Sequence, residues 1–251
     1  MDATEVMLPR LTRREFREAL QAGKFQAAIL ATASNEQHSE HLPMDFDLIA
    51  VTHIAREAAA TLYPQVIVTI PMAIGISEHH MIHKGTISAK PGGWLAVIFD
   101  AVESLSRHGI RNILILNGHG GNTAPIKAGL DQWRLHFKLD QWRLHFKLVD
   151  PGLNLHFVSY WDLIPLDFLH RHLKTRAIPG HAKEFETSLA LALIPDEVRQ
   201  KAMREHTDPD PLEATAEKGN LFVEEAIRRT VEFLEGMMSG RIHPAEVKHF
   251  P

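Results

Sequence analysis

The sequence predicts an α/β protein whose largely parallel sheet is flanked by helices on both faces, a three-layer sandwich. Short and nearly wholly apolar segments recur along the chain, as expected of strands that are buried on both sides. Segments with apolar residues at helical spacing lie between them, and this alternation is typical of parallel sheets. A chain of 251 residues with 45% hydrophobic content can bury a sizeable core, so residues 1–251 are expected to form a single domain.

The individual elements follow from local patterns. The chain opens with a surface helix, in which Thr12 and Glu15 have capping-box spacing and Gly23 ends the helical pattern. The predicted strands are 27–32, 66–70, 113–116 and 155–159. The predicted helices after the first are 48–62, 94–107, 185–194 and 221–238. Because ligands of parallel sheets usually bind beyond the carboxyl ends of the strands, a functional site is expected there.

Composition excludes several classes of partner. The 27 basic and 31 acidic residues give a formal net charge of −4, and no block of like charges resembles a nucleic-acid-binding arm. No run approaches the roughly 18 apolar residues of a membrane span, and the N-terminus has no signal-peptide pattern. We therefore expect a cytoplasmic protein that acts on a small molecule. With no cysteine and 17 histidines, any metal must be held by imidazole and carboxylate.

A nine-residue segment, LDQWRLHFK, occurs twice in tandem within residues 130–147. If both copies continue a helix that begins near Thr123, the second copy lengthens it by roughly 13 Å. It also places Trp142 on the face opposite Trp133, so one copy must find new surroundings. Either the duplication protrudes near the surface, or its additional tryptophan and histidine reshape the rim of a pocket or a subunit contact.

Three clusters carry the candidate chemistry. They are NEQHSEHLPMDFD after the first strand, NGHGGN after the third and GHAKEFETS before a later helix. The residues of interest are Glu36, His38, Asp47, His119, His181 and Glu186. Taken singly, residues of the first cluster are better explained as solvated loop side chains or caps, and Asp47 can cap the helix that starts at Leu48. The first two clusters, however, are expected at the same edge of the sheet.

The glycine-rich turn NGHGGN could be a phosphate loop, a metal site or a tight turn. A P-loop needs Gly-Lys-Ser/Thr and a dinucleotide fingerprint needs G-x-G-x-x-G, and the turn has neither pattern. Asn-Gly and Gly-Gly are ordinary turn formers, so the motif alone would fit a plain turn. The neighbouring His and carboxylate clusters favour a metal site at His119.

Together, NEQHSEHLPMDFD, GISEHHMIHKGTIS, ILNGHGGN and GHAKEFETS resemble the creatininase (creatinine amidohydrolase) family in type and order. The resemblance implies an α/β fold, assembly as a homohexamer and two divalent metal ions per chain, zinc or manganese. By motif it implies Glu36 and His119 on one metal, His38 and Glu186 on the other, and Asp47 bridging them. It also implies His181 as the catalytic proton shuttle beside the metals.

Simple charge counting agrees with that ligand set. Two divalent ions bring four positive charges, and three carboxylates with a bridging hydroxide bring four negative ones, while two neutral imidazoles complete a mixed shell. Such a pair of ions lowers the pKa of the water between them and presents hydroxide to a polarised carbonyl. His181 would then carry the proton to the leaving nitrogen.

The substrate is the most open part of the prediction. Creatinine-hydrolysing members carry a tyrosine and a glutamate where this chain has Gly120 and Gly121, which argues against creatinine itself. These two glycines are expected to let substrate approach the metals. The resemblance also implies that Ser77 touches substrate, although a turn serine is an equal explanation. Trp161 or Asp162 is expected over the pocket, with core packing as the alternative for Trp161.

The predicted function is hydrolysis of an amide C–N bond by metal-bound hydroxide, in a small cyclic amide or a formamide. Within the family, the alternatives are a lactone, a C–C bond in a cyclic diketone of the oxidised-inositol type, or a peptide-derived cofactor precursor. A metal-binding ligand sensor without catalysis is the alternative from another class. Retention of His181 and all five implied ligands argues against that last alternative.

Overall fold

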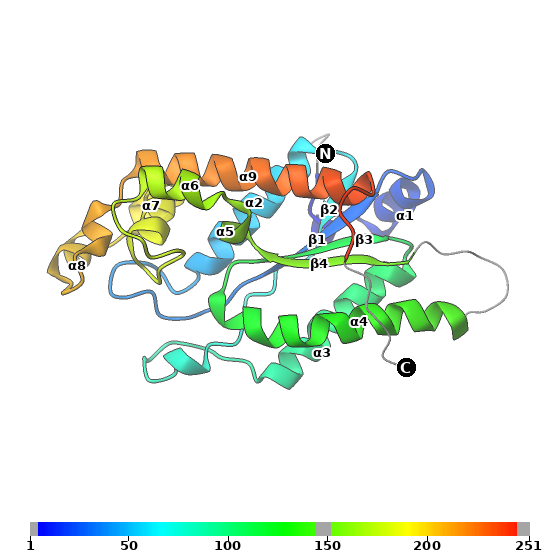
Figure 1. Ribbon diagram of the computed structural model, residues 1–251, viewed down its shortest axis with the longest axis horizontal. Coiled ribbons are helices and arrows are strands. Elements are labelled where there is room, and N and C mark those ends of the chain that lie inside the picture. Colours follow the sequence, from blue (N-terminus) through cyan, green and yellow to red (C-terminus); the bar gives the residue numbers. More distant parts are fainter. Residues whose placement is uncertain (1–4, 144–151, 245–251) are drawn as a thin grey trace.

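The computed structural model describes residues 5–143 and 152–244 and contains a parallel four-stranded sheet (Figure 1). The strands are β1 (Ala27–Thr32), β2 (Val66–Val68), β3 (Asn112–Asn117) and β4 (Asn154–Ser159), in the order β2-β1-β3-β4. All three strand pairs are parallel, with Ala27 opposite Val66 on one side and Asn112 on the other. The predicted α/β class is therefore confirmed.

Helices cover both faces of this sheet (Figure 1). The helices are α1 (Arg13–Gln21), α2 (Phe46–Thr61), α3 (Pro91–Arg107), α4 (Thr123–Arg143), α5 (Tyr160–Leu163), α6 (Leu166–His172), α7 (Glu184–Leu193), α8 (Gln200–Glu205) and α9 (Ala216–Met238). Because side chains alternate along a strand, Ile29 packs with α2, α7 and α9, whereas Leu30 packs with α3 and α4. Two buried cores result, one on each side of the sheet.

Local chemistry explains most element boundaries. The capping box of Thr12 and Glu15 is present at the start of α1, as predicted. β2 ends at Val68 rather than at residue 70, since Pro71 has no N–H to donate to the ladder. α9 begins five residues earlier than predicted because the Thr215 side chain accepts a bond from Lys218 N–H.

α2 begins two residues earlier than predicted, and this changes the environment of Asp47. The N-cap position is Asp45, whose side chain makes no capping bond, and Asp47 lies inside the first helical turn. Asp47 is only 3% exposed. A capping role for Asp47 is therefore wrong, and its buried carboxylate needs another explanation.

The tandem repeat lies partly in α4 and partly outside the described residues. The first copy and the start of the second lie in one helix, α4. This helix runs from the carboxyl edge of the sheet back towards the amino edge (Figure 1). Residues 144–147 of the second copy lie outside the described residues. The part of the repeat that α4 contains runs away from the carboxyl edge, and the described residues that line the pocket at that edge include none of it.

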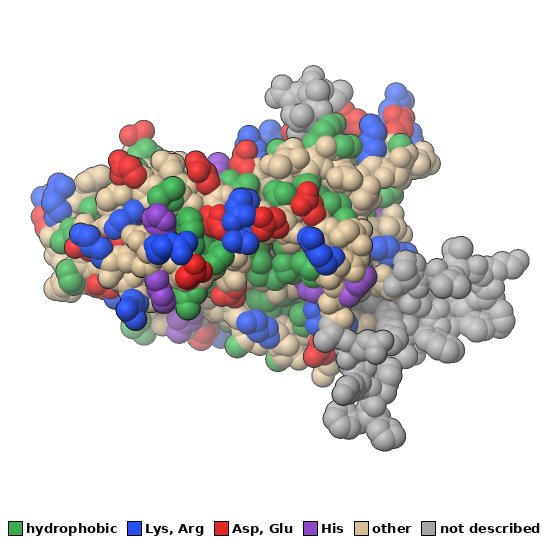
Figure 2. Space-filling model, turned by 45° about the horizontal axis from the view of Figure 1, so that its top comes forward, with side chains coloured by type: hydrophobic (Ala, Val, Ile, Leu, Met, Phe, Trp, Pro, Cys, Tyr) green, Lys and Arg blue, Asp and Glu red, His purple; other side chains and the backbone are tan. Residues whose placement is uncertain are grey.

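The surface matches the balanced charge of the chain. Figure 2 shows one face on which basic and acidic side chains are interspersed rather than separated. Among the described residues, no helix is sufficiently long and apolar to span a bilayer.

Candidate metal centre

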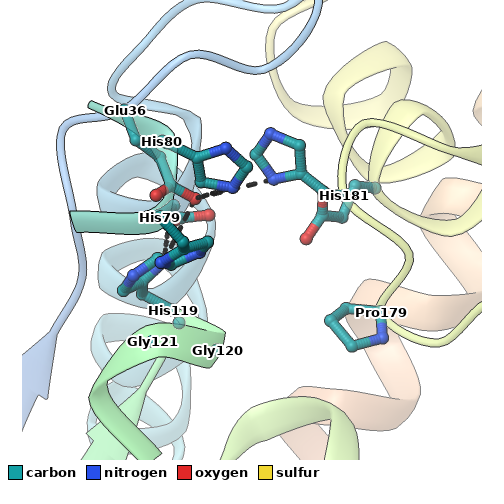
Figure 3. Close-up of a pocket in the computed structure, with 11 residues that line it drawn as sticks. Glu36, His79, His80, His119, Gly120, Gly121, Pro179 and His181 are labelled. Atoms are coloured by element: carbon teal, nitrogen blue, oxygen red, sulfur yellow. Dashed lines mark ion pairs between the residues drawn. The ribbon is translucent and has the colours of Figure 1, made fainter. Parts of the chain in front are cut away.

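A pocket of about 150 Å³ lies where β1, β3 and the loop before α7 meet at the carboxyl edge. Its lining residues are Glu36, Asp47, His79, His80, Gly118, His119, Gly120, Gly121, Pro179, His181 and Glu186. In Figure 3 the side chains of His119 and His79 lie on one wall, and Pro179 and His181 lie on the other. This is the edge at which a parallel sheet is expected to bind its ligand.

Two asparagines hold the turn after β3 in place. The Asn117 side chain accepts bonds from Thr32 Oγ1 and His119 N–H and donates to the His119 carbonyl. The Asn122 side chain accepts from Ile76 N–H and donates to the Ala33 carbonyl. Asn122 thus joins the turn to the loops that follow β1 and β2.

The five predicted ligands come together in the structure. Glu36, His38, Asp47, His119 and Glu186 are each no more than 4% exposed. Asp47 lies at the centre, because its Oδ1 is 3.0 Å from His38 Nε2 and its Oδ2 is 3.1 Å from His119 Nδ1. Glu36 Oε1 is 3.2 Å from His119 Nδ1, and Glu186 Oε2 is 3.9 Å from His38 Nε2. The arrangement has two halves that share Asp47.

Backbone carbonyls orient both buried histidines towards these carboxylates. A carbonyl oxygen only accepts, so His38 donates Nδ1–H to the Glu36 carbonyl at 3.1 Å and leaves Nε2 facing Asp47. His119 likewise donates Nε2–H to the Ile76 carbonyl at 3.0 Å and leaves Nδ1 facing Glu36 and Asp47. A second hydrogen-bonding partner that fixes the tautomer is the usual setting of a metal-binding histidine.

The carboxylates dominate the electrostatics of the two histidines. Burial opposes a charged ring at His38, but Asp47 and Glu186 outweigh it and raise its pKa to about 9. Burial is likewise outweighed at His119, where Asp47 and Glu36 raise the pKa to about 10. Burial raises the pKa of Glu186 to about 7. In the metal-free protein the protons on these two rings offset the buried carboxylates near pH 7, and a bound cation would take the place of those protons.

Unpartnered atoms show that these residues fit a metal. Glu36 Oε2 and Asp47 Oδ2 are buried and have no hydrogen bond; the contact of Asp47 Oδ2 with His119 lacks hydrogen-bond geometry. Leaving buried carboxylate oxygens unpaired is costly, and coordination of a cation would satisfy them. Three ligand groups among the described residues have donor atoms within 4.8 Å of one another: Glu36–His38–His181, Glu36–His79–His119 and His38–Asp47–Glu186.

Two glutamates of the same helix have different roles. Glu186 Oε2 accepts the Ala182 N–H at 2.6 Å and lines the pocket. Glu184, two residues earlier, is fully buried and instead accepts from Lys174 N–H, Thr175 N–H and Lys218 Nζ. Glu184 therefore anchors the loop before α7, whereas Glu186 faces the candidate metal centre.

His181 lies at the mouth of the pocket, with 31% of its side chain exposed. Its Nδ1 is 3.5 Å from Glu36 Oε1, and its ring is stacked on that of His80 at 4.3 Å between centroids. Burial lowers the pKa of His181 to about 4, so the ring is neutral near pH 7. A neutral imidazole beside the carboxylates can exchange a proton with a bound molecule.

The predicted substrate contacts divide into two groups. Gly120 and Gly121 line the pocket. Ser77 is fully buried behind the pocket wall, where its Oγ lies 3.2 Å from His119 Nε2 and 2.5 Å from Ser34 Oγ. Trp161 packs on Tyr160 in the core, and neither it nor exposed Asp162 is among the lining residues. The structure therefore brings only the two glycines to the pocket.

Sequence reasoning missed three pocket features. His79 and His80 both line the pocket. The amide of Gln37 contacts both His80 and His181. The only signal in the sequence was position: Gln37 stands between Glu36 and His38, and His79 and His80 follow Ser77.

Comparison with known proteins connects this geometry to a family. The family model for creatininase, described as creatinine amidohydrolase, matches residues 9–214. The chain belongs to the creatininase family. This chain is 26% identical to creatinine amidohydrolase of Pseudomonas putida over 210 residues, which are 80% of this chain and 76% of that protein.

Two further relatives of this creatininase-family chain act on other compounds. It is 32% identical to a mycofactocin precursor peptide peptidase of Mycolicibacterium smegmatis over 110 residues, 41% of this chain and 42% of that protein. It is 25% identical to a 3-dehydro-scyllo-inosose hydrolase of Thermotoga maritima over 206 residues, 79% of this chain and 59% of that protein. Members of the creatininase family are hydrolases.

A solved creatininase has the same fold. Its crystal structure superposes with a TM-score of 0.77 at 24% identity, covering 92% of this chain and 97% of that one. Other solved creatininases include a zinc–zinc form and a manganese form.

Proposed function

We propose that this chain is a metal-dependent amidohydrolase that cleaves a C–N bond in a small cyclic amide or formamide. The observation that carries the proposal is the shared carboxylate of Asp47, which faces His38 through one oxygen and His119 through the other. In this proposal Glu36 and His119 hold one divalent ion, His38 and Glu186 hold the second, and Asp47 contacts both. When bound, zinc or manganese ions supply a water of lowered pKa and a Lewis acid for the substrate carbonyl.

The remaining residues are proposed to bind the substrate and to handle its proton. Gly120 and Gly121 leave room at one wall, since neither carries a side chain into the pocket. His181 faces them from the opposite wall (Figure 3) and is proposed to pass a proton to the leaving nitrogen. No lysine or arginine is among the described residues that line the pocket, which favours a small substrate without strong negative charge.

A substrate screen tests the reaction class. Protein stripped of metal and reloaded with zinc or manganese is assayed against cyclic amides, N-formyl compounds, short peptides and lactones. We expect turnover of a cyclic amide or formamide by the loaded protein and none by the stripped protein. Undiminished turnover by protein with no metal, as determined by elemental analysis, would refute the metal-dependent mechanism.

Two histidine variants separate metal binding from proton transfer. His119→Ala is expected to abolish activity and to lower the metal content by about one ion per chain, because it removes a ligand. His181→Ala is expected to leave the metal content unchanged and to lower kcat by roughly 100-fold or more, a usual contribution of acid–base catalysis. Equal metal loss in both variants would show that His181 is a ligand.

A second candidate function is peptide hydrolysis on a peptide-derived precursor. The 32% identity to a mycofactocin precursor peptide peptidase favours it, although that match spans less than half of either chain. The short-peptide arm of the screen decides between the two candidates. A homohexamer in the cytoplasm belongs to the same proposal, and light scattering of the purified protein tests the oligomeric state.

A further inference from the structure

The side-chain amide of Gln37 lies between the rings of His80 and His181. Its Nε2 is 3.0 Å from His80 Nδ1 and 2.9 Å from His181 Nε2. The two rings are stacked at 4.3 Å between centroids, and Figure 3 shows them close together at the mouth of the pocket. One amide group is therefore positioned to hold two imidazoles at once.

The orientation of the Gln37 amide is decided by its other end. Ser39 N–H donates to Gln37 Oε1 at 2.9 Å, and a backbone N–H requires an acceptor. The oxygen therefore faces Ser39 and the NH₂ group faces the two histidines. The backbone N–H of Gln37 is also bound, to Thr86 Oγ1 at 3.2 Å, which fixes the residue on its loop.

This orientation determines where both rings carry their protons. An NH₂ group only donates, so His80 Nδ1 and His181 Nε2 must both be unprotonated acceptors. In each neutral ring the proton then lies on the other nitrogen. That nitrogen faces the same atom in both cases, because His80 Nε2 is 3.9 Å and His181 Nδ1 is 3.5 Å from Glu36 Oε1.

We propose that Gln37 is a positioning residue that holds His80 and His181 as N–H donors facing Glu36 and thereby keeps both rings out of the metal coordination shell. An imidazole binds a metal through an unprotonated nitrogen. Here the proton of the neutral ring lies on the nitrogen nearest Glu36, whereas in neutral His38 and His119 a backbone carbonyl holds the proton on the far nitrogen and leaves the near one unprotonated. Although Glu36, His38 and His181 lie within coordination distance of one another, His181 is thus reserved for the substrate.

The inference deepens the proposed role of His181 and rests on the proposed function only for its effect on turnover. In the resting protein the proton of His181 then lies on Nδ1, which faces Glu36 Oε1 at 3.5 Å. It can accept a proton at Nε2 only after the bond from Gln37 is broken. Gln37 would therefore affect the rate of the chemical step more than substrate binding.

Nitrogen NMR of the zinc-loaded protein tests the tautomers directly. The protein is labelled with ¹⁵N-histidine, and the two rings are assigned by the signals lost in His80→Asn and His181→Asn. We expect His80 Nδ1 and His181 Nε2 to give the shift of an unprotonated nitrogen that is not bound to zinc. Protonated signals at these atoms, or zinc bound to either ring, would overturn the proposal.

Variants at Gln37 show whether this residue is the cause. Gln37→Glu has nearly the same shape but cannot donate, so both acceptor nitrogens should become protonated. Gln37→Ala should give mixed tautomers, and it serves as the second variant if the charged one does not fold. Asn35→Ala, on the same loop but bonded to the Gly85 carbonyl rather than to a histidine, should leave both tautomers unchanged. Unchanged tautomers in both Gln37 variants would refute the proposal.

Turnover separates this inference from the proposed function. On a substrate found by screening, Gln37→Glu is expected to lower kcat by about 10- to 100-fold with little change in KM, the usual effect of removing a partner that orients a site residue. The expected tautomers in a protein that hydrolyses none of the compounds would support the role of Gln37 and count against the hydrolase. Full kcat in a Gln37→Glu variant with altered tautomers would overturn the link to the chemical step.

Discussion

At the scale of single residues, the buried carboxylate of Asp47 is the centre of the candidate metal site. Its two oxygens face two different histidines, and one of those oxygens has no hydrogen-bond partner. The position in the first turn of α2 adds the positive end of the helix dipole, which favours a negative side chain there. A change at Asp47 therefore affects both halves of the site.

Asp47→Asn is expected to lower the metal content from about two ions per chain to less than one. The amide keeps the shape of the carboxylate, but it removes the charge and turns an NH₂ group towards one of the two histidines. Metal content by elemental analysis, after dialysis against limiting zinc, measures the effect.

Glu184→Gln is the matched control for this substitution. Glu184 is also a buried carboxylate of the same region, but it bonds Lys218 and backbone N–H groups of the loop before α7. We expect this variant to lower the melting temperature and to retain its metals. Full metal occupancy in Asp47→Asn would contradict a shared ligand.

At the scale of an element, the two glycines of the turn after β3 have different structural reasons. A Cβ atom at Gly121 would overlap the Ile76 carbonyl and crowd the His119 ring, whereas a Cβ at Gly120 would have no atom within 4 Å. Gly121 is therefore needed for the fold of the turn. Gly120 is open and affects only the space available to substrate.

Alanine substitutions distinguish the two glycines. Gly121→Ala is expected to cost about 1–3 kcal/mol of unfolding free energy, as overpacking usually does, and to weaken metal binding through His119. Gly120→Ala should unfold like the parent protein and change KM instead. Urea denaturation and steady-state kinetics on the two variants measure these effects, and equal destabilisation by both would contradict the packing explanation.

The nine-residue tandem repeat is also a feature of a single element, because its described part lies in α4. α4 carries its described part from the end of the sheet with the candidate metal centre towards the opposite edge, and no residue of that part is among the described pocket-lining residues. Deletion of residues 139–147 is therefore expected to leave metal content and kcat unchanged. Elemental analysis and activity of the deletion variant test this expectation. Release of the metals would show that the repeat supports the site.

At the scale of the whole molecule, the proposed metal site would couple folding, metal binding and protonation through His38 and His119. Their folded-state pKa values, about 9 and about 10, lie above the ordinary value of 6.5. A raised histidine pKa stabilises the metal-free fold fully below about pH 6.5, and this contribution is lost as pH rises through 9 to 10. Metal binding requires both rings to be neutral, so it releases protons and strengthens with pH.

The stabilisation by zinc is therefore expected to grow between pH 6.5 and 9. Melting curves of stripped and zinc-loaded protein should show the stripped form losing stability across this range while the loaded form retains it. Calorimetry in buffers of different ionisation enthalpy should detect release of at least about two protons per chain at pH 7, one from each ring, with a further fraction from Glu186, whose pKa is about 7. Absence of proton release would mean that the two histidines are not ligands.

Much of the whole-molecule architecture could be predicted from the sequence. All four strands and the longer helices followed from apolar spacing, because burial of a sheet face imposes that pattern directly. The convergence of Glu36, Asp47 and His119 followed from sheet topology, since parallel strands end at one edge. The direction of a loop side chain has no such pattern, and for that reason Ser77 was expected in the pocket but lies behind its wall.

Other parts of the site depended on contacts that no local pattern encodes. Glu184 and Glu186 look alike in the sequence. In the folded chain Glu184 bonds the backbone of the loop before α7, whereas Glu186 faces the candidate metal centre. Gln37 has no acid–base or ligand chemistry of its own, so its importance appears only when both histidines are placed beside it.

The hydrogen bonds of Asn122 constrain one wall of the pocket more than the other. One side chain clamps the segments after β1, β2 and β3 into a single unit, so the wall that contains His119 and Gly121 can shift only as a whole. The facing wall, with Pro179 and His181, comes from one separate loop before α7 (Figure 3). Substitutions in this one loop can therefore enlarge or reshape the pocket while the proposed metal ligands stay the same. Substrate specificity is thus most easily changed, in evolution or by engineering, at this loop.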